Sequence, residues 1–185
     1  MKPYLSKSIA MKTLVLSLAF ASFSSLAADP LSASLQTKVD KYKQKLVEWA
    51  ANPVIVSAVK EANAKGPLSG MTNSKWLEVD DKDSLAQTFT SSKAGTLVKK
   101  WEEDKDINKL VIRDEKGNLV AASTKPLLYN NSVRPVYINA MKGQTWTANA
   151  VAPDPTTQVK SVQASAPVMD AGKVIGVIHV GITSE

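Results

Sequence analysis

The stretch VKSVQASAPVMDAGKVIGVIHVGI, Val159–Ile182, decides the fold. It contains two long apolar-rich runs joined by DAGK, whose residues favour a tight turn, so it predicts an antiparallel β-hairpin. Along the first run Ser161, Gln163 and Ser165 alternate with apolar residues, which places all three on one side of the sheet. Polar residues in such a row usually face solvent. A ligand pocket on that side would instead bring Gln163 to the ligand.

A second hairpin precedes this one. The stretch KLVIRDEKGNLVAAS, Lys109–Ser123, has two apolar runs around the turn signal DEKGN. Between the hairpins, residues 132–142 predict a short helix that is entered through Pro135 and closed by Gly143. Residues 144–158, QTWTANAVAPDPTTQ, predict a strand that ends in a proline-rich turn.

The N-terminal part has a helical pattern. Apolar residues recur there at spacings of four and three, with lysines between them: Leu35, Val39, Tyr42, Leu46 and Trp49. This seam can pack on the chain's own sheet, which is the use we prefer. It can also pair with a second copy of the chain, so a homodimer through the N-terminal helix is the alternative.

Further helices follow along the chain. Pro53 suits the first turn of a second helix, with Asn52 as its N-cap and Gly66 at its end. The composition of residues 66–75 predicts a loop, and residues 80–106 predict one more helix.

Helices first, followed by a mainly antiparallel sheet, indicate an α+β domain with helices packed on a central sheet. The long helical part covers residues 31–105 and the sheet part covers residues 108–183. We expect residues 28–185 to form a single domain, because this length suffices for one hydrophobic core.

The first residues have the features of a secretory signal peptide, residues 1–27. Three lysines precede TLVLSLAFASFSSLA, residues 13–27, which is too short to span a bilayer comfortably and ends in a small-x-Ala pattern. The sequence leaves open whether this signal starts at Met1 or Met11, and whether it is cleaved after Ala27 or Ala28. The expected location is the periplasm or the extracellular space.

Composition excludes several classes of function. Removing the signal lowers the formal charge from +6 to +3, and no lysine-rich patch interleaved with aromatics remains, so we expect no nucleic-acid partner. The chain has no cysteine and one histidine, which excludes disulfides, thiolate catalysis and Cys-ligated zinc. No nucleophile elbow or phosphate-binding glycine loop occurs. We therefore predict a protein that is not an enzyme and that carries no metal or cofactor.

At this point the sequence resembles the Cache superfamily, whose members are extracytoplasmic PAS-like sensor domains also called PDC domains. The likeness covers the region after the signal and rests on short motifs in the two hairpins: Asp114, Gly117, Val120, Ala121 and Ser123 in the first, and Pro167, Val168, Gly172 and Gly176 in the second. It implies a PAS-like sheet that holds a small ligand between a central helix and the final strands. Members usually report ligand binding to kinase, cyclase or chemotaxis modules.

The segment YNNSVRPVYINA is similar to the ligand motif of the amino-acid-binding branch of this family. Tyr129, Arg134, Tyr137 and Ala140 occupy matching positions, and Val136 stands where the branch has tryptophan. An arginine can bind a carboxylate with two parallel hydrogen bonds, and phenol hydroxyls can add to them.

The amine-binding half of that motif is less complete. Asp154 matches an acid of the branch, but Ala152 replaces its tyrosine and Gly181 stands about where a late aspartate would hold a ligand amine. With Trp146 expected near the pocket, the predicted ligand-binding residues are Tyr129, Arg134, Tyr137, Trp146, Asp154 and Gln163.

The sequence thus predicts a non-catalytic sensor module for a small carboxylate, either an organic acid or an amino acid. No output module follows the last predicted strand, so we expect the domain to act with a membrane receptor or cyclase, or as a soluble binding protein. The alternative is a secreted interaction module that uses the N-terminal helix and binds no small ligand.

Overall fold

The computed structural model describes residues 31–185. The predicted signal peptide, residues 1–27, lies outside this range. Among the described helices, none combines the length and the hydropathy that crossing a bilayer requires.

The centre of the structure is a six-stranded antiparallel sheet in the order β2-β1-β6-β5-β3, with β4 also paired to β5. Both predicted hairpins are present, as β1–β2 and β5–β6, and the predicted α+β class is confirmed. The strands are β1 (Ile107–Asp114), β2 (Leu119–Ala122), β3 (Trp146–Thr147), β4 (Ala152–Pro153), β5 (Lys160–Asp170) and β6 (Lys173–Thr183).

The turn between β5 and β6, together with a bulge between Val168 and Met169, fixes the register of the long hairpin. Ala171 and Gly172 both have positive φ, 48° and 81°, as a two-residue hairpin turn of the favoured twist requires. Ser165 then lies opposite His179 in the ladder, and Gln163 lies opposite Gly181. These residues face one side of the sheet, while the alternating apolar residues face the other.

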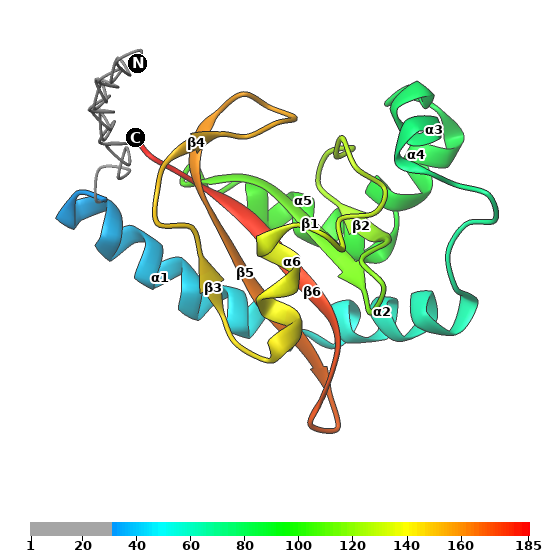
Figure 1. The fold of residues 1–185 in the computed structure, drawn as a ribbon, viewed down its shortest axis with the longest axis horizontal. Helices are drawn as coiled ribbons and strands as arrows, with labels where there is room; N and C mark the ends of the chain where they lie inside the picture. Colours follow the sequence, from blue (N-terminus) through cyan, green and yellow to red (C-terminus); the bar gives the residue numbers. More distant parts are fainter. Residues whose placement is uncertain (1–30) are drawn as a thin grey trace, which may run out of the picture.

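Helices cover both faces of this sheet. In Figure 1, α1, α2 and α5 lie behind the strands, and α6 crosses in front of β5 and β6. The helices are α1 (Ala33–Ala50), α2 (Pro53–Lys65), α3 (Asn73–Glu78), α4 (Ser84–Thr90), α5 (Lys93–Glu102), α6 (Pro135–Ile138) and the short 3-10 helix η1 (Ala140–Lys142).

Three element predictions were wrong in part. The predicted loop 66–75 contains the start of α3, because the Thr72 hydroxyl accepts the Lys75 N–H and caps a new helix. The single helix predicted for residues 80–106 is two helices, since the Ser92 hydroxyl accepts the N–H of Gly95 and starts α5 afresh. The strand predicted within residues 144–158 is reduced to the two-residue strands β3 and β4.

The apolar seam of α1 packs on the chain's own sheet, as preferred from the sequence. Leu35, Val39, Tyr42 and Leu46 are at most 7% exposed and belong to the main core. Trp49 stacks on Trp101 of α5 with ring centroids 5.0 Å apart. The alternative of a helix pair through this seam is therefore wrong, because these side chains are already buried. Burial of the seam does not test whether the N-terminal helix takes part in a homodimer, so the predicted homodimer stays a prediction.

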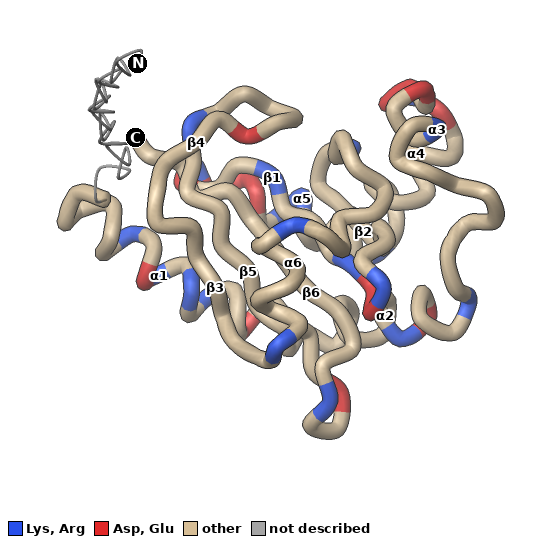
Figure 2. Tube along the Cα trace, in the orientation of Figure 1, with Lys and Arg blue, Asp and Glu red and all other residues tan. Residues whose placement is uncertain are grey.

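Acidic residues gather at the outer end of α3 and α4 (Figure 2). Two of them, Asp80 and Asp83, accept backbone N–H groups at the entry to α4. Such helix-end carboxylates satisfy free amides and favour the positive end of the helix dipole. This cluster therefore stabilises a helix start.

A truncation in the seam tests this core. Leu46 is fully buried, so Leu46→Ala should lower the free energy of unfolding by about 2–5 kcal/mol. The matched control is Val47→Ala in the next position of the same helix, where the side chain is 51% exposed and the change should stay within about 0.5 kcal/mol. Urea unfolding measures both. Equal losses in the two variants would contradict the packing described here.

Candidate functional site

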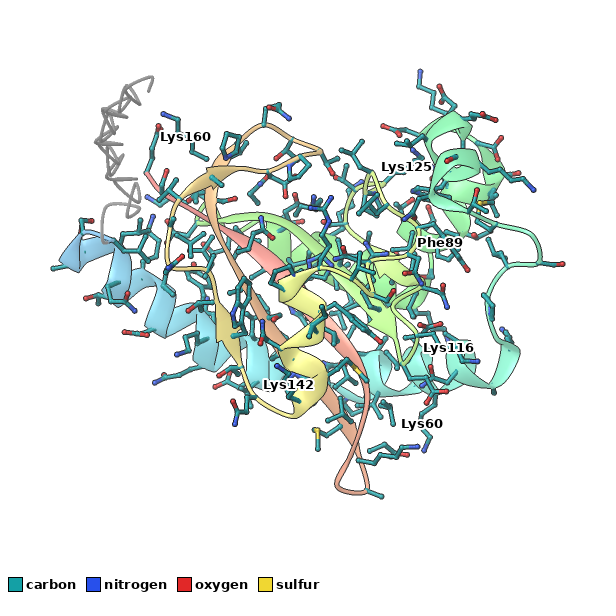
Figure 3. All side chains as sticks on the ribbon, viewed as in Figure 1. Lys60, Phe89, Lys116, Lys125, Lys142 and Lys160 are labelled. Carbon is teal, nitrogen blue, oxygen red and sulfur yellow. The ribbon has the colours of Figure 1, made fainter. Side chains whose placement is uncertain are left out.

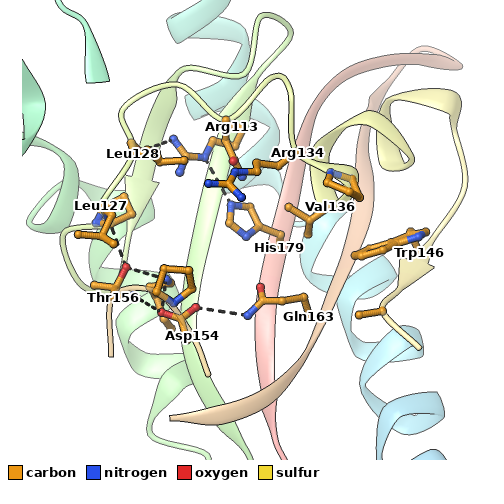
Figure 4. Close-up of a pocket in the computed structure, with 16 residues that line it drawn as sticks. Arg113, Leu127, Leu128, Arg134, Val136, Trp146, Asp154, Thr156, Gln163 and His179 are labelled. Atoms are coloured by element: carbon orange, nitrogen blue, oxygen red, sulfur yellow. Dashed lines mark hydrogen bonds and ion pairs between the residues drawn. The ribbon is translucent and has the colours of Figure 1, made fainter. Parts of the chain in front are cut away.

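A cavity of about 270 Å³ lies on the face of the sheet opposite α1. Strands β1, β5 and β6 form its floor, and residues 126–136 and 154–156 cover it (Figure 4). Most of its wall is apolar, from Pro126, Leu127, Leu128, Pro135, Val136, Trp146, Ala148 and Pro155. Its remaining lining is polar or charged and collects at two ends.

The first polar end consists of Arg113, Arg134 and His179, which lie together in Figure 4. Arg113, on β1, is 1% exposed. Its Nη1 donates to the carbonyl oxygens of Leu128 and Tyr129 at 3.0 and 2.7 Å. Its Nε donates a long hydrogen bond of 3.4 Å to Nε2 of His179. Arg134 is exposed at the mouth of the cavity, just before α6.

Arg113 is a buried cation with no ion-pair partner among residues 31–185. Neighbouring Asp114 forms no ion pair with it, and the Asp114 carboxylate accepts N–H groups of the β1–β2 turn instead. Burial lowers the pKa of Arg113 to about 9, so the guanidinium stays charged at neutral pH. A buried charge without a counter-charge is costly. This end of the cavity is therefore suited to an anion.

His179 adds a neutral donor. Burial, with the positive charges of Arg113 and Lys109, holds the pKa of His179 well below its ordinary value of 6.5. Because Nε2 accepts a hydrogen bond from Arg113, the ring proton lies on Nδ1. Nδ1 has no hydrogen-bond partner within the described chain. His179 therefore lines this end of the cavity as a neutral ring.

The second polar end is a buried ion pair. Lys109 Nζ lies 2.7 Å from Asp154 Oδ1, and the two residues are 6% and 2% exposed. Lys109 also donates to the Thr156 hydroxyl at 2.9 Å, and Gln163 donates to Asp154 Oδ2 at 3.3 Å. Burial alone would raise the pKa of Asp154, but the hydrogen bond and charge of Lys109 outweigh it and lower that pKa. The Asp154 carboxyl group is therefore ionised at neutral pH.

A β-bulge places Lys109 at this position. The register of β1 against β6 shifts between Asn108 and Leu110, and Lys109 has a φ of 59°, which is unusual for a residue with a side chain. Glu102 fixes the backbone there, because its carboxylate accepts the Lys109 N–H at 2.9 Å. The bulge turns the Lys109 side chain toward Asp154.

Four of the six predicted ligand-binding residues line this cavity together. They are Arg134, Trp146, Asp154 and Gln163. Gln163 faces the cavity, which was the less usual of the two orientations open from the sequence. Val136 also lines the cavity, at the position where the amino-acid-binding branch has tryptophan.

Tyr129 does not line this cavity. Its ring lies in a second core cluster with Trp76 and Phe89, and its hydroxyl accepts the backbone N–H of Leu68 at 2.9 Å. The backbone carbonyl, rather than the phenol, faces Arg113.

Tyr137 is also outside the cavity lining. Helix α6 begins at Pro135, and its Tyr137 packs against Val177 of β6 with Ala140. The Tyr137 hydroxyl donates to the carbonyl oxygen of Asp114 at 3.3 Å, and burial raises its pKa to about 12. The two phenols therefore secure the segment around Arg134 from outside the cavity.

Sequence reasoning missed Lys109, Arg113 and His179 as lining residues. Arg113 and His179 interrupt apolar runs of central strands, in VIRD and VIHV. A charged residue on the covered face of a central strand needs a partner or a cavity, and that was the available signal. The bulge at Lys109 leaves no such pattern.

No family model and no curated protein sequence matches the chain. Among solved structures, it is similar to the sensor domain of the V. cholerae histidine kinase DctB, with 17% identity over 81% of this chain and 57% of that one, and a TM-score of 0.43. The E. coli DcuS sensor domain gives 14% identity, coverages of 80% and 92%, and a TM-score of 0.45.

The ligand-binding domain of the Pseudomonas aeruginosa PAO1 amino acid chemoreceptor PctC, in complex with GABA, gives 12% identity, coverages of 81% and 55%, and a TM-score of 0.45. The chain thus spans little more than half the length of the DctB and PctC structures. With TM-scores below 0.5, these matches do not assign a function or a ligand to this chain.

Acidification tests the state of His179. The unfolded chain takes up a proton near the ordinary pKa of 6.5, whereas the folded protein keeps His179 neutral to lower pH. The free energy of unfolding should therefore be at a plateau at neutral pH and fall by up to about 1.4 kcal/mol per pH unit below pH 6.5. Urea unfolding over this range measures the slope.

The control is His179→Gln, because the chain has no other histidine. The free energy of unfolding of this variant should change little from neutral pH down to the pH at which carboxyl groups take up protons. Because the pKa of Asp154 is lowered from 3.8 in the folded protein, that residue reduces the stability only below pH 3.8. A wild-type profile as flat as that of the variant would show that His179 is not held neutral by the fold.

Proposed function

We propose that residues 28–185 form a single extracytoplasmic sensor domain that binds a small carboxylate, an organic acid or an amino acid, in the cavity beside Arg113 and Arg134. The observation that carries this proposal is the Arg113 guanidinium, which is buried at the cavity wall and has no ion-pair partner in the described chain. A ligand anion in the cavity would supply the missing counter-charge.

The donor set favours a carboxylate among anions. Guanidinium groups bind carboxylates with paired, charge-assisted hydrogen bonds, and Arg113 keeps its Nη2 free of hydrogen bonds within residues 31–185. Arg134 stands at the mouth and His179 supplies a neutral N–H beside them. Three cations and one carboxylate line the cavity, so its formal charge is positive.

The domain acts by binding rather than by chemistry. The one histidine bonds to Arg113 and makes no hydrogen bond to a hydroxyl in residues 31–185, so it does not activate a nucleophile. A sensor of this kind works with a membrane receptor or cyclase, and its location is the periplasm or the extracellular space. The predicted signal peptide and the lack of cysteine support that location.

A thermal-shift screen with Arg134→Ala tests the proposal. A carboxylate at 100 times its Kd should stabilise the wild-type protein by about 2.7 kcal/mol, which raises Tm by several degrees for a domain of this size. Arg134→Ala should weaken binding about 10- to 100-fold, because a hydrogen bond to a charged group contributes about 1.5–3 kcal/mol.

The matched control is Lys142→Ala, which removes an exposed cation from η1 in the same segment. Figure 3 shows Lys142 at the end of the segment, and it does not line the cavity. Its binding should equal that of the wild type. The proposal fails if no carboxylate stabilises the folded protein, or if binding survives unchanged in both Arg134→Ala and Arg113→Lys.

A further inference from the structure

Asp154 is the one acid that lines the cavity within residues 31–185, and its oxygens are already in use. Oδ1 accepts hydrogen bonds from Lys109 Nζ at 2.7 Å and from the backbone N–H groups of Thr156 and Thr157 at 2.8 and 3.1 Å. Oδ2 accepts from Gln163 at 3.3 Å. Asp154 therefore has little capacity left for a ligand ammonium group.

The chain holds Lys109 in this position firmly. Its backbone adopts a left-handed conformation at the bulge, and its Nζ reaches both Asp154 and the Thr156 hydroxyl. Lys109 is 6% exposed, so solvent does not compete for its charge. Moving Lys109 away would leave a carboxylate and an ammonium group buried without each other, which is strongly unfavourable.

An amino acid in this cavity would meet three positive charges and no free negative one. Its carboxylate suits Arg113 and Arg134, but its ammonium group would lose water and gain no counter-charge. A cation–π contact could replace a counter-charge only in part, and Trp146 is the one aromatic residue of the described lining.

We infer that Lys109 Nζ supplies the positive charge that a ligand amine would otherwise bring to Asp154, and that the cavity therefore selects carboxylates without an amine. This inference rests on the proposed carboxylate-binding function. It names the ligand class as a carboxylate with an apolar body, because the wall between the two polar ends is formed by side chains such as Leu127, Val136 and Trp146.

Matched ligand pairs that differ by the α-amino group test this selection in the wild-type protein. The pairs are propanoate with alanine, 4-methylpentanoate with leucine, and 3-phenylpropanoate with phenylalanine. Titration calorimetry should give a Kd for at least one amine-free acid that is at least about tenfold lower than that of its amino acid.

A reversal of selectivity tests the role of the ion pair. Lys109→Met removes the ammonium group beside Asp154 and keeps most of the side-chain volume. The Kd of the amino acid divided by the Kd of its amine-free partner should therefore be at least about tenfold lower than in the wild type. Lys109→Met with Asp154→Asn removes both charges and should not show this decrease. Lys100→Met on the exposed side of α5 is the control and should behave as the wild type.

The outcomes separate the inference from the proposed function. If a wild-type amino acid binds as tightly as its amine-free partner, the inference is wrong and carboxylate binding stands. If neither member of any pair binds, the proposed function fails and the inference falls with it. If Lys109→Met does not fold, the wild-type pairs and the double variant, which removes both members of the buried Lys109–Asp154 ion pair, still decide the question.

Discussion

The register between β5 and β6 is the constraint on which the rest of the structure depends. The turn at Ala171–Gly172 and the bulge between Val168 and Met169 set it together. In this register Val162, Ala164 and Ala166 lie on the face that α1 covers, while Gln163 faces the cavity. A shift by one residue would exchange the two faces along the whole hairpin. The side chains of the main core and those of the cavity floor therefore alternate along the same two strands.

The cavity carries costs that this core must offset. Arg113 is a buried cation without an ion-pair partner in the described chain, and Lys109 keeps a left-handed backbone that costs about 1–3 kcal/mol. The ion pair of Lys109 with Asp154 offsets the desolvation of its two members only because both are also hydrogen-bonded.

Much of the fold could be predicted from local signals, and part of the site could not. The two hairpins and the helix start at Pro53 follow from turn residues, capping residues and periodicity, which act over a few positions. Arg134 was found because it lies in a recognisable motif. Tyr129 and Tyr137 flank it in that motif, but their rings are buried in clusters away from the cavity. The direction of these side chains depends on the turn before α6 and on packing against β6. Pairing of β1 with β6 places Arg113 in the cavity lining, and a single stretch of sequence does not reveal which strands pair.

Arg113 joins the first polar end of the cavity to the segment that covers it. One guanidinium donates to the carbonyl oxygens of Leu128 and Tyr129 and also faces the cavity. The same segment is also held at Pro126, whose carbonyl accepts the indole N–H of Trp76 at 2.7 Å, and at Tyr129, whose carbonyl accepts the N–H of Leu119 at 2.8 Å as well. A guanidinium has a fixed set of donors in one plane. The orientation of Arg113 toward the cavity and its hydrogen bonds to the covering segment therefore cannot vary independently. The polar end of the cavity and its cover are thus joined through one side chain.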